Sequence, residues 1–560
     1  MGLTISREQQ RFPTRNYPYR KGGACLAAPA DAVPPEANVL YRRVGGIDTD
    51  PRPMDAEELA KLDDPLGRLL RSGNPFPLTA RSLIAAFDVL GGTPDALPRQ
   101  LVFLVADGGH IPWTPQTDRL QRAFRFVIVR GKADFTLLVS SSTLPDSAAD
   151  DAFLQIIGWD DTHKVFHFYE RLAGAYFWAG MSSHALQAAT RGKGPFDSHV
   201  NGATVMKELR SPWIHWHAPQ AGINENALAP DDPLRNDPLF IGRVTAERME
   251  TEVARPGIRR WNAARIARAV DADGSWNDVR HFLRQAVTDT TVNLATSETA
   301  SRLIGEQTPL KLPLSFFLNR DTLFTTLGLE PDDPADADIV IPGLVYRRCL
   351  ADYDVHLSDG LLRIEGDSHF AFLTPEPAFE DTQLIDALVL ASLLTRRFVA
   401  ALTMTDFPNP VFSARRAALL RHVPTVAKGP NAGEAMEREF LEEIRATTGQ
   451  QGNGANSPER EFLSNFETVD FEAASRERIA RYFALLRAGM TDPETVDGWF
   501  RLAEYRRRRF RRRPLAEFAL TTPRTNIPLT AAPLRMTEFG RVEPVRTAET
   551  DEPQPPQGET

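Results

Sequence analysis

Residues 192–217 concentrate the side-chain types that bind metals and pack around cofactors. This stretch holds three of the eleven histidines and two of the eight tryptophans of the chain, namely His199, His215, His217, Trp213 and Trp216. Imidazole nitrogens are frequent ligands for zinc, copper and iron. Indole rings add a large apolar area and one hydrogen-bond donor. The stretch is therefore the first candidate for a ligand, metal or cofactor site.

The closely spaced histidines of this stretch suggest a metal site. His215 and His217 lie between Pro212 and Pro219, which disfavour a helix. In an extended chain, residues two apart face the same side, so both imidazoles could bind one ion. We name His199, His215 and His217 as candidate ligands; zinc or non-haem iron would still need another ligand, such as a carboxylate. The alternative is that these imidazoles hydrogen-bond to backbone carbonyls beside packed tryptophans.

The five residues that end at His199 match the haem-attachment pattern C-x-x-C-H except at its two cysteine positions, which hold Pro195 and Ser198. His-Val-Asn-Gly follows at 199–202 and Met-Lys-Glu-Leu-x-x-Pro-Trp at 206–213. With these segments, the chain resembles a family of bacterial proteins that carry a cytochrome-c-like haem domain. The resemblance covers roughly residues 190–220, with a further similarity at 407–413.

The resemblance implies a set of haem contacts. His199 would be the proximal iron ligand, Met206 or Met404 the distal ligand, and Trp213 and Trp216 part of the pocket wall. Axial ligation by histidine and methionine favours electron transfer, whereas an open axial position favours small-molecule binding. No thioether can form without the two cysteines, so the resemblance implies haem held noncovalently or a fold that has lost haem. In the second case, His199 serves only to stabilise its turn.

Two functions are consistent with these features. The first is a redox or haem-related protein related to c-type cytochromes, with an oxidoreductase activity left open. The second is a non-catalytic scaffold or interaction protein that keeps the fold only, with an unknown protein or small molecule as partner. The sequence contains no Walker A loop, no G-x-G-x-x-G after a strand, no G-x-S-x-G elbow and no kinase signature. Nucleotide-driven and serine-hydrolase mechanisms are therefore unsupported.

Composition narrows the remaining classes. The net charge of −9 argues against a general nucleic-acid binder. Cys25 and Cys349 form no C-x-x-C pair, which excludes a zinc finger or a disulfide framework. The amino terminus lacks the apolar region of a signal peptide, and the longest apolar run, 384–394, is too short to cross a bilayer. We therefore expect a cytoplasmic protein without a membrane span.

Residues 506–513 contain seven arginines in eight positions. Such a run could bind an anionic partner weakly, because the attraction is local on a chain of negative net charge. The alternative is internal neutralisation by carboxylates such as Glu504. We favour the internal alternative.

Hydrophobic periodicity predicts an α+β fold. Six segments have the pattern of strands in an antiparallel sheet or small barrel, at 101–106, 124–129, 135–139, 153–157, 165–169 and 175–178. Alternation in the fifth segment predicts Phe166 and Phe168 on one face and His167 on the other. Helical patterns follow at 245–254, 258–271, 275–304, 314–327, 380–404, 412–421, 432–447, 458–467, 471–488 and 491–511, with a strand-like insert at 361–373.

The same patterns predict an order of segments along the chain. We expect an extended leader (1–54), a helical pair (55–95), an antiparallel β domain (96–190), a helix-rich cytochrome-c-like domain (191–450), a C-terminal helical region (451–540) and a disordered tail (541–560).

Overall fold

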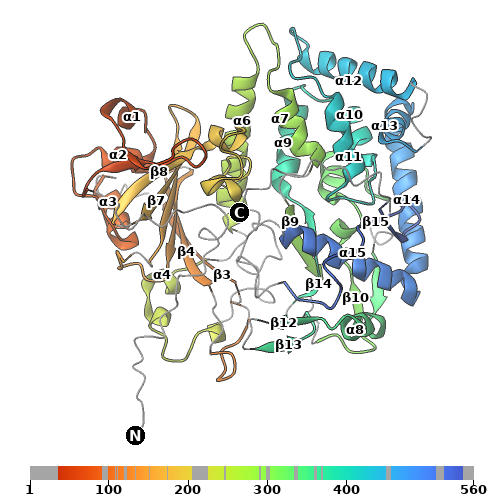
Figure 1. The fold of residues 1–560 in the computed structure, drawn as a ribbon, viewed down its shortest axis with the longest axis horizontal. Coiled ribbons are helices and arrows are strands. Elements are labelled where there is room, and N and C mark those ends of the chain that lie inside the picture. The colour runs from red at the N-terminus through yellow and green to blue at the C-terminus, as the bar shows by residue number, and fades with distance from the viewer. Residues whose placement is uncertain are drawn as a thin grey trace. The chain divides into compact units, whose positions relative to one another are not determined.

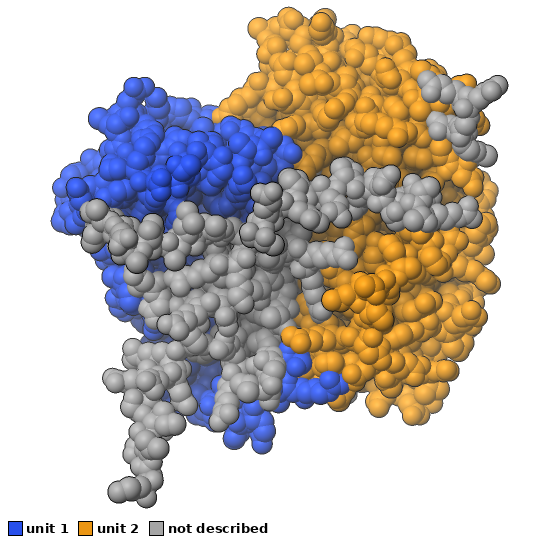
Figure 2. Space-filling model, viewed as in Figure 1, with its two compact units in different colours: residues 1–261, 358–363, 514–521 blue, residues 262–357, 364–513, 522–560 orange. Residues whose placement is uncertain are grey.

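The computed structural model describes two compact units. Its described residues are 36–90, 99–107, 109, 111–118, 123–132, 134–149, 152–172, 174–204, 225–244, 248–288, 292–297, 303–332, 338–358, 362–367, 370–449, 456–511 and 522–545. Unit 1 comprises residues 1–261, 358–363 and 514–521, and unit 2 comprises residues 262–357, 364–513 and 522–560 (Figures 1 and 2). The units divide after Trp261, so each includes more than one of the segments predicted from the sequence.

Unit 1 contains an eight-stranded sheet of order β2-β1-β8-β7-β6-β5-β4-β3 (Figure 1). The strands from β3 to β8 are antiparallel to their neighbours, and they confirm all six strands predicted from the sequence. Their bounds are Arg99–Asp107, Ala123–Gly131, Phe135–Ser142, Leu154–Asp160, Val165–Leu172 and Ala175–Met181. The strand β1 (Leu40–Arg42) adds to the sheet parallel to β8, and β2 (Arg52–Pro53) pairs with β1. Two parts of the predicted leader are therefore sheet strands.

The sheet is apolar on the face that the first helices cover. Alternate residues of the strands pack with buried side chains of α2 (Pro65–Leu70) and α3 (Ala80–Leu90), including Leu66 and Phe87. The short α1 (Ala56–Ala60) precedes them and begins with a capping box at Asp55. Because side chains alternate between the two faces of a strand, one set of apolar side chains points toward these helices. This alternation explains why the six strands could be predicted from the sequence.

The helix-rich part of the chain agrees with the predicted pattern in most segments. The described helices from residue 255 on are α6 (Arg255–Ala269), α7 (Val279–Thr288), α8 (Gly343–Asp352), α9 (Phe379–Leu390), α10 (Arg396–Met404), α11 (Ala414–Ala418), α12 (Ala432–Gly449), α13 (Pro458–Glu467), α14 (Phe471–Gly489) and α15 (Pro493–Arg511). The predicted helix 380–404 is two helices, because Ser392 adopts a positive φ and Thr395 caps a new helix. A mixed helix and strand fold is confirmed, whereas a cytochrome-c-like domain stays a prediction.

One predicted helix is wrong over half of its length. The segment 275–304 continues as a helix only to Thr288, and β9 (Val292–Ser297) follows. β9 pairs antiparallel with β14 (Ala371–Pro377), which overlaps the last three residues of the strand-like insert predicted at 361–373; β13 (Arg363–Glu365) lies in the first part of that insert. The sequence after Thr288 is rich in β-branched residues, which favour strands over helices.

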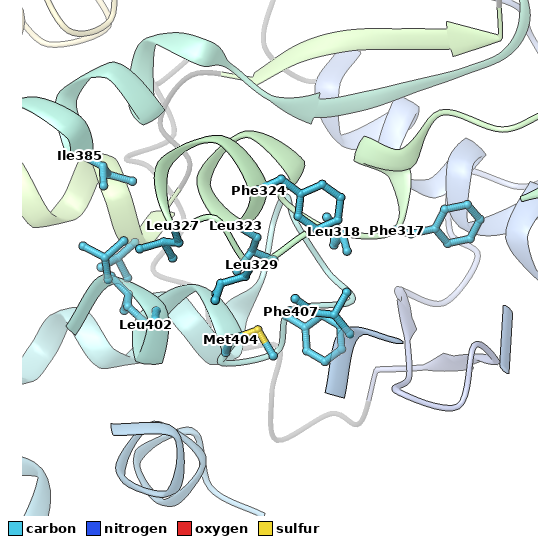
Figure 3. Packing of buried hydrophobic residues seen from close by; sticks show 14 of the residues in the cluster. Phe317, Leu318, Leu323, Phe324, Leu327, Leu329, Ile385, Leu402, Met404 and Phe407 are labelled. Carbon is cyan, nitrogen blue, oxygen red and sulfur yellow. The ribbon is translucent and has the colours of Figure 1, made fainter. Parts of the chain in front are cut away.

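The core of unit 2 is a single large cluster of buried aromatic and aliphatic side chains. Figure 3 shows a part of this cluster, with Met404 at the end of α10 beside Leu402, Leu329 and Phe407. Met404 is 1% exposed, so its thioether fills space in an apolar core.

The arginine run lies in this unit and is largely buried. Arg506 donates to the carbonyl oxygen of Phe316 at 2.5 Å, and Arg507 donates to that of Leu373 at 2.8 Å. Arg508 also donates to a backbone carbonyl, that of Pro528. Arg506 and Arg507 are at most 2% exposed. These arginines therefore do not present the anion-binding surface that we considered at 506–513; residues 512 and 513 lie outside the described residues.

The carboxyl-terminal part adds one more small sheet. β15 (Leu534–Met536) pairs with β16 (Val542–Pro544), which lies in the segment predicted as a disordered tail. The reason is that Val542 packs against the core of unit 2. Residues 546–560 of that segment are outside the described part. In the described ranges, no helix combines the length and the apolar character that crossing a membrane requires.

Candidate functional site

His199 lies in a tight turn that follows the 3-10 helix Gly194–Asp197. Its ring Nδ1 is 3.0 Å from the carbonyl oxygen of Ala203. A carbonyl oxygen can only accept a hydrogen bond, so Nδ1 carries the proton in the neutral ring and Nε2 carries the lone pair. This is the tautomer in which a histidine ligates a metal through Nε2 while its other nitrogen is held by a carbonyl.

The turn is tied to the sheet through Ser182, at the end of β8. Ser182 Oγ donates to the carbonyl oxygen of Gly202 at 2.7 Å and accepts from the backbone N–H of Phe166 at 2.9 Å. Gly202 has φ +77°, and a Cβ atom there would lie 2.3 Å from the carbonyl oxygen of Ser182. A glycine is therefore required at this position for His199 to be held close to β7 and β8.

One aromatic ring contacts the imidazole of His199 in the described structure, and a second ring packs against the first. The ring of Phe168 lies 5.3 Å from it and also 5.3 Å from the ring of Phe196. Phe168 therefore faces the His199 turn, whereas His167 faces the other side and bonds to Trp178. The alternation predicted for β7 is confirmed. His199 is 9% exposed, which leaves it near the surface of its unit.

A cluster of polar side chains lies on the face of β7 opposite to the His199 turn. Trp178 Nε1 donates to His167 Nδ1 at 3.0 Å, so Nδ1 is the acceptor and His167 donates from Nε2 to Asp160 at 3.2 Å. Asp160 is fully buried and also accepts from the backbone N–H groups of His163 and Asp63. The single lone pair of His167 is already used by Trp178, so this imidazole is not placed to act as a general base on a substrate.

The charge of Asp160 is stabilised by these donors. Burial raises the pKa of its carboxyl, but the hydrogen bonds from His167, His163 and Asp63 outweigh burial and hold that pKa below its usual range. Asp160 thus stays ionised and anchors His167.

Asp64 is a second buried acid, next to this cluster. It caps α2 by accepting from Leu66 N at 3.0 Å, and it accepts from the Tyr169 hydroxyl at 2.5 Å. Burial raises the pKa of the Asp64 carboxyl, while the neighbouring His167 and the Tyr169 hydroxyl oppose that rise. Room for Asp64 depends on Gly158, where a Cβ atom would lie 2.1 Å from its Oδ2.

We expect Gly158→Ala to destabilise unit 1 by about 1–3 kcal/mol, because the added methyl group must displace a buried carboxylate or bend β6. Urea unfolding followed by tryptophan fluorescence measures this change. Gly174→Ala is a useful comparison, since a Cβ atom there meets nothing within 4 Å although φ is +75°. Equal losses in the two variants would contradict the steric explanation.

The remaining residues predicted from the sequence lie in unit 2 or outside the described residues. Met404 belongs to unit 2, whereas His199 belongs to unit 1. Five others lie in the range 205–224, outside the described residues: Met206, Trp213, His215, Trp216 and His217. The proposed roles of these residues stay predictions.

A polar chain in unit 2 was not recognised from the sequence. Arg265 on α6 donates to Gln285 Oε1 at 2.9 Å, and Gln285 Nε2 donates to Asp381 Oδ1 at 2.8 Å. All three side chains are at most 5% exposed, and burial lowers the pKa of Arg265 to about 10. These hydrogen bonds join α6, α7 and the first turn of α9, and we interpret them as a structural link between helices. These hydrogen bonds could not be predicted from the spacing of residues in the sequence, because Gln285 and Asp381 are 96 positions apart.

Among the residues that the structure describes, no three His, Cys, Asp or Glu side chains are grouped so that they could hold a metal ion. Comparisons of the chain with family models, with curated proteins and with solved structures find no match. The functional argument therefore depends on the geometry around His199 and on the sequence next to it.

Proposed function

We propose that the chain is a redox or haem-related protein that binds haem noncovalently, with His199 as axial ligand through Nε2. The observation that carries this proposal is the hydrogen bond between His199 Nδ1 and the carbonyl oxygen of Ala203, 3.0 Å long. It fixes the tautomer and the ring orientation that a metal-ligating imidazole needs.

The surroundings of His199 suit an apolar, planar ligand. The ring of Phe168 contacts the imidazole, Phe196 packs against Phe168, and the segment with Trp213 and Trp216 follows His199 closely in sequence. Haem, when bound, supplies one-electron redox chemistry. The contribution of the chain is to hold the imidazole, to pack aromatic rings against the ligand and to exclude water from it.

The proposal is tested by titration with hemin, followed by the Soret band, for the parent chain and two variants. We expect His199→Ala to weaken binding by at least about tenfold, because a metal ligand is lost. His356→Ala is the matched control, since His356 Nδ1 also bonds to a carbonyl oxygen, that of Asp354 at 2.7 Å, but in unit 2. Circular dichroism of both variants confirms that the folds are retained. Equal affinities in all three proteins would show that His199 is not the ligand.

A non-catalytic scaffold is the second candidate function, and one observation favours it. His167, Asp160 and Asp64 all satisfy their hydrogen bonds inside unit 1. Under this alternative, His199→Ala lowers the melting temperature through the lost bond to Ala203 and changes no ligand binding. The same hemin titration, combined with thermal melts, therefore separates the two functions.

A further inference from the structure

A continuous series of rings leads from His199 to the cluster on the other face of β7. Neighbouring ring centroids are 5.3 Å apart from His199 to Phe168, 5.3 Å from Phe168 to Phe196, and 6.3 Å from Phe196 to His184. All these separations lie within the range of direct aromatic contact, about 4.5–7 Å.

The series continues from His184 to two oxidisable rings. The centroid of His184 is 5.7 Å from that of Trp178, Trp178 is 6.0 Å from His167, and His167 is 6.3 Å from Tyr169. We call these seven rings the ring series: His199, Phe168, Phe196, His184, Trp178, His167 and Tyr169. Indole and phenol rings are the side chains most readily oxidised by one electron, and both lie at the same end of the ring series.

Both oxidisable rings donate their acidic hydrogen to a group that can accept a proton. Trp178 Nε1 donates to the lone pair of His167, whose Nε2 in turn donates to the ionised Asp160. The Tyr169 hydroxyl donates to Asp64 at 2.5 Å. An imidazole that gains the indole proton becomes an imidazolium beside a carboxylate, which is a favourable ion pair.

Other buried tryptophans have weaker proton acceptors. Trp159 Nε1 donates to Asp161 Oδ1 at 3.2 Å, but Asp161 is exposed and its pKa is lowered, so this carboxylate is a weak base. Trp276 is fully buried, and its Nε1 has no hydrogen-bond partner. Trp499 Nε1 donates to the carbonyl oxygen of Gly540, and Trp261 Nε1 donates to that of Asn201. A backbone carbonyl is not basic enough to keep a proton. The bond from Trp178 differs from these in that its acceptor is an imidazole that a buried carboxylate supports.

A nearby cation makes the proton acceptor necessary. The guanidinium carbon of Arg42 lies 5.5 Å from the centroid of the Trp178 ring. A positive charge at this distance disfavours a radical cation on the indole. Loss of the Nε1 proton to His167 removes the extra positive charge from the indole, so oxidation of Trp178 is favoured only as a proton-coupled step.

We propose that the ring series is a path for one-electron transfer, in which Trp178 is the electron donor and His167 the proton acceptor. One electron leaves Trp178 along the ring series to a transition-metal oxidant at the His199 end, which is reduced by one electron. The Nε1–H bond of Trp178 breaks, and the proton forms a bond to Nδ1 of His167. Tyr169 then re-reduces the indole by one electron; its own proton goes to Asp64, and His167 returns its proton to Trp178. This inference rests on the proposed function for its oxidant: ferric haem is too weak to oxidise an indole, but a haem at His199 would be such an oxidant once a peroxide had oxidised it by two electrons.

The test supplies its own oxidant, so that it does not depend on haem. A ruthenium polypyridyl photo-oxidant is attached at the exposed Lys193, as Lys193→Cys in a Cys25→Ser, Cys349→Ser background. Laser-flash absorption and electron paramagnetic resonance then detect radicals. We expect a neutral tryptophan radical, followed by a tyrosyl radical. The tryptophan signal should be lost in Trp178→Phe, and the tyrosyl signal should be lost in Tyr169→Phe.

Two further variants distinguish a path from mere packing. Phe196→Leu should slow radical formation on Trp178, whereas Phe282→Leu, in contact with the buried Trp276 at 5.7 Å, should leave it unchanged. His167→Gln should abolish the neutral radical without removing the indole. Radicals that persist in Trp178→Phe, or that form equally fast in Phe196→Leu, would overturn the proposal. Radical formation in a chain that does not bind hemin would support the electron-transfer path and contradict the proposed haem function. Hemin binding without radical formation would support the haem function and contradict the path.

Discussion

Arg507→Leu is expected to lower the free energy of unfolding of unit 2 by about 3 kcal/mol. Arg507 Nη2 lies 2.7 Å from Glu504 Oε2, and both side chains are at most 2% exposed. Removing the cation leaves a buried carboxylate and also loses the hydrogen bond to the Leu373 carbonyl. The loss should stay at the lower end of the usual range of about 3–5 kcal/mol, because Arg508 Nε remains 4.0 Å from Glu504.

A surface pair on the same helix is the matched control for this prediction. Arg501 pairs with Asp497 at 3.1 Å and is 45% exposed. Arg501→Leu should therefore cost less than about 1 kcal/mol. The double variant Arg507→Leu, Glu504→Leu should recover most of the stability, since no unpaired charge remains. Urea unfolding followed by circular dichroism measures all four proteins, and a loss in the double variant as large as in Arg507→Leu would contradict the explanation.

Asp160→Asn is expected to destabilise unit 1 by about 3 kcal/mol at neutral pH, since hydrogen bonds to a charged acceptor contribute about 1.5–3 kcal/mol each. The amide would face the ring and backbone donors of His163, the ring of His167 and the N–H of Asp63, but it has only one acceptor oxygen. At least one buried donor would lose its partner.

The loss of unfolding free energy caused by Asp160→Asn should become smaller at low pH. The folded-state pKa of Asp160 is lowered, so its contribution to stability is present above the unfolded pKa of about 3.9 and is lost as the pH falls toward the folded value. The stability difference between the parent and Asp160→Asn should therefore stay constant from about pH 7 to about pH 5 and narrow as the pH falls further. A difference that does not change with pH would mean that the carboxylate charge is not what stabilises this cluster.

The strands of unit 1 could be predicted because their signal is local. Alternation of apolar residues over five or six positions is visible in any window, and the burial of Phe168 and His167 on opposite sides of β7 follows from it. β9 lacked such a signal, because all six of its residues are buried and its partner β14 lies far along the chain. Its strand conformation depends on that pairing rather than on its own pattern.

The clusters of polar residues could not be predicted, because their members are distant in sequence. Asp64 and Tyr169 are 105 positions apart, and Arg506 bonds to a carbonyl 190 positions away. Consecutive arginines are typical of a solvated surface, yet here α15 passes through the core and each guanidinium meets a different backbone carbonyl. His199 was predicted as a ligand from its motif alone, and its tautomer became visible only with the turn to Ala203.

The measurement that most directly tests the account is the haem content of the chain purified from haem-supplemented cells. We predict a Soret band in the isolated protein, and a pyridine haemochrome assay that gives close to one haem per chain. Acidified acetone should extract all of this haem, since Pro195 and Ser198 cannot form thioethers. A colourless protein that also gains no Soret band when hemin is added would contradict the account.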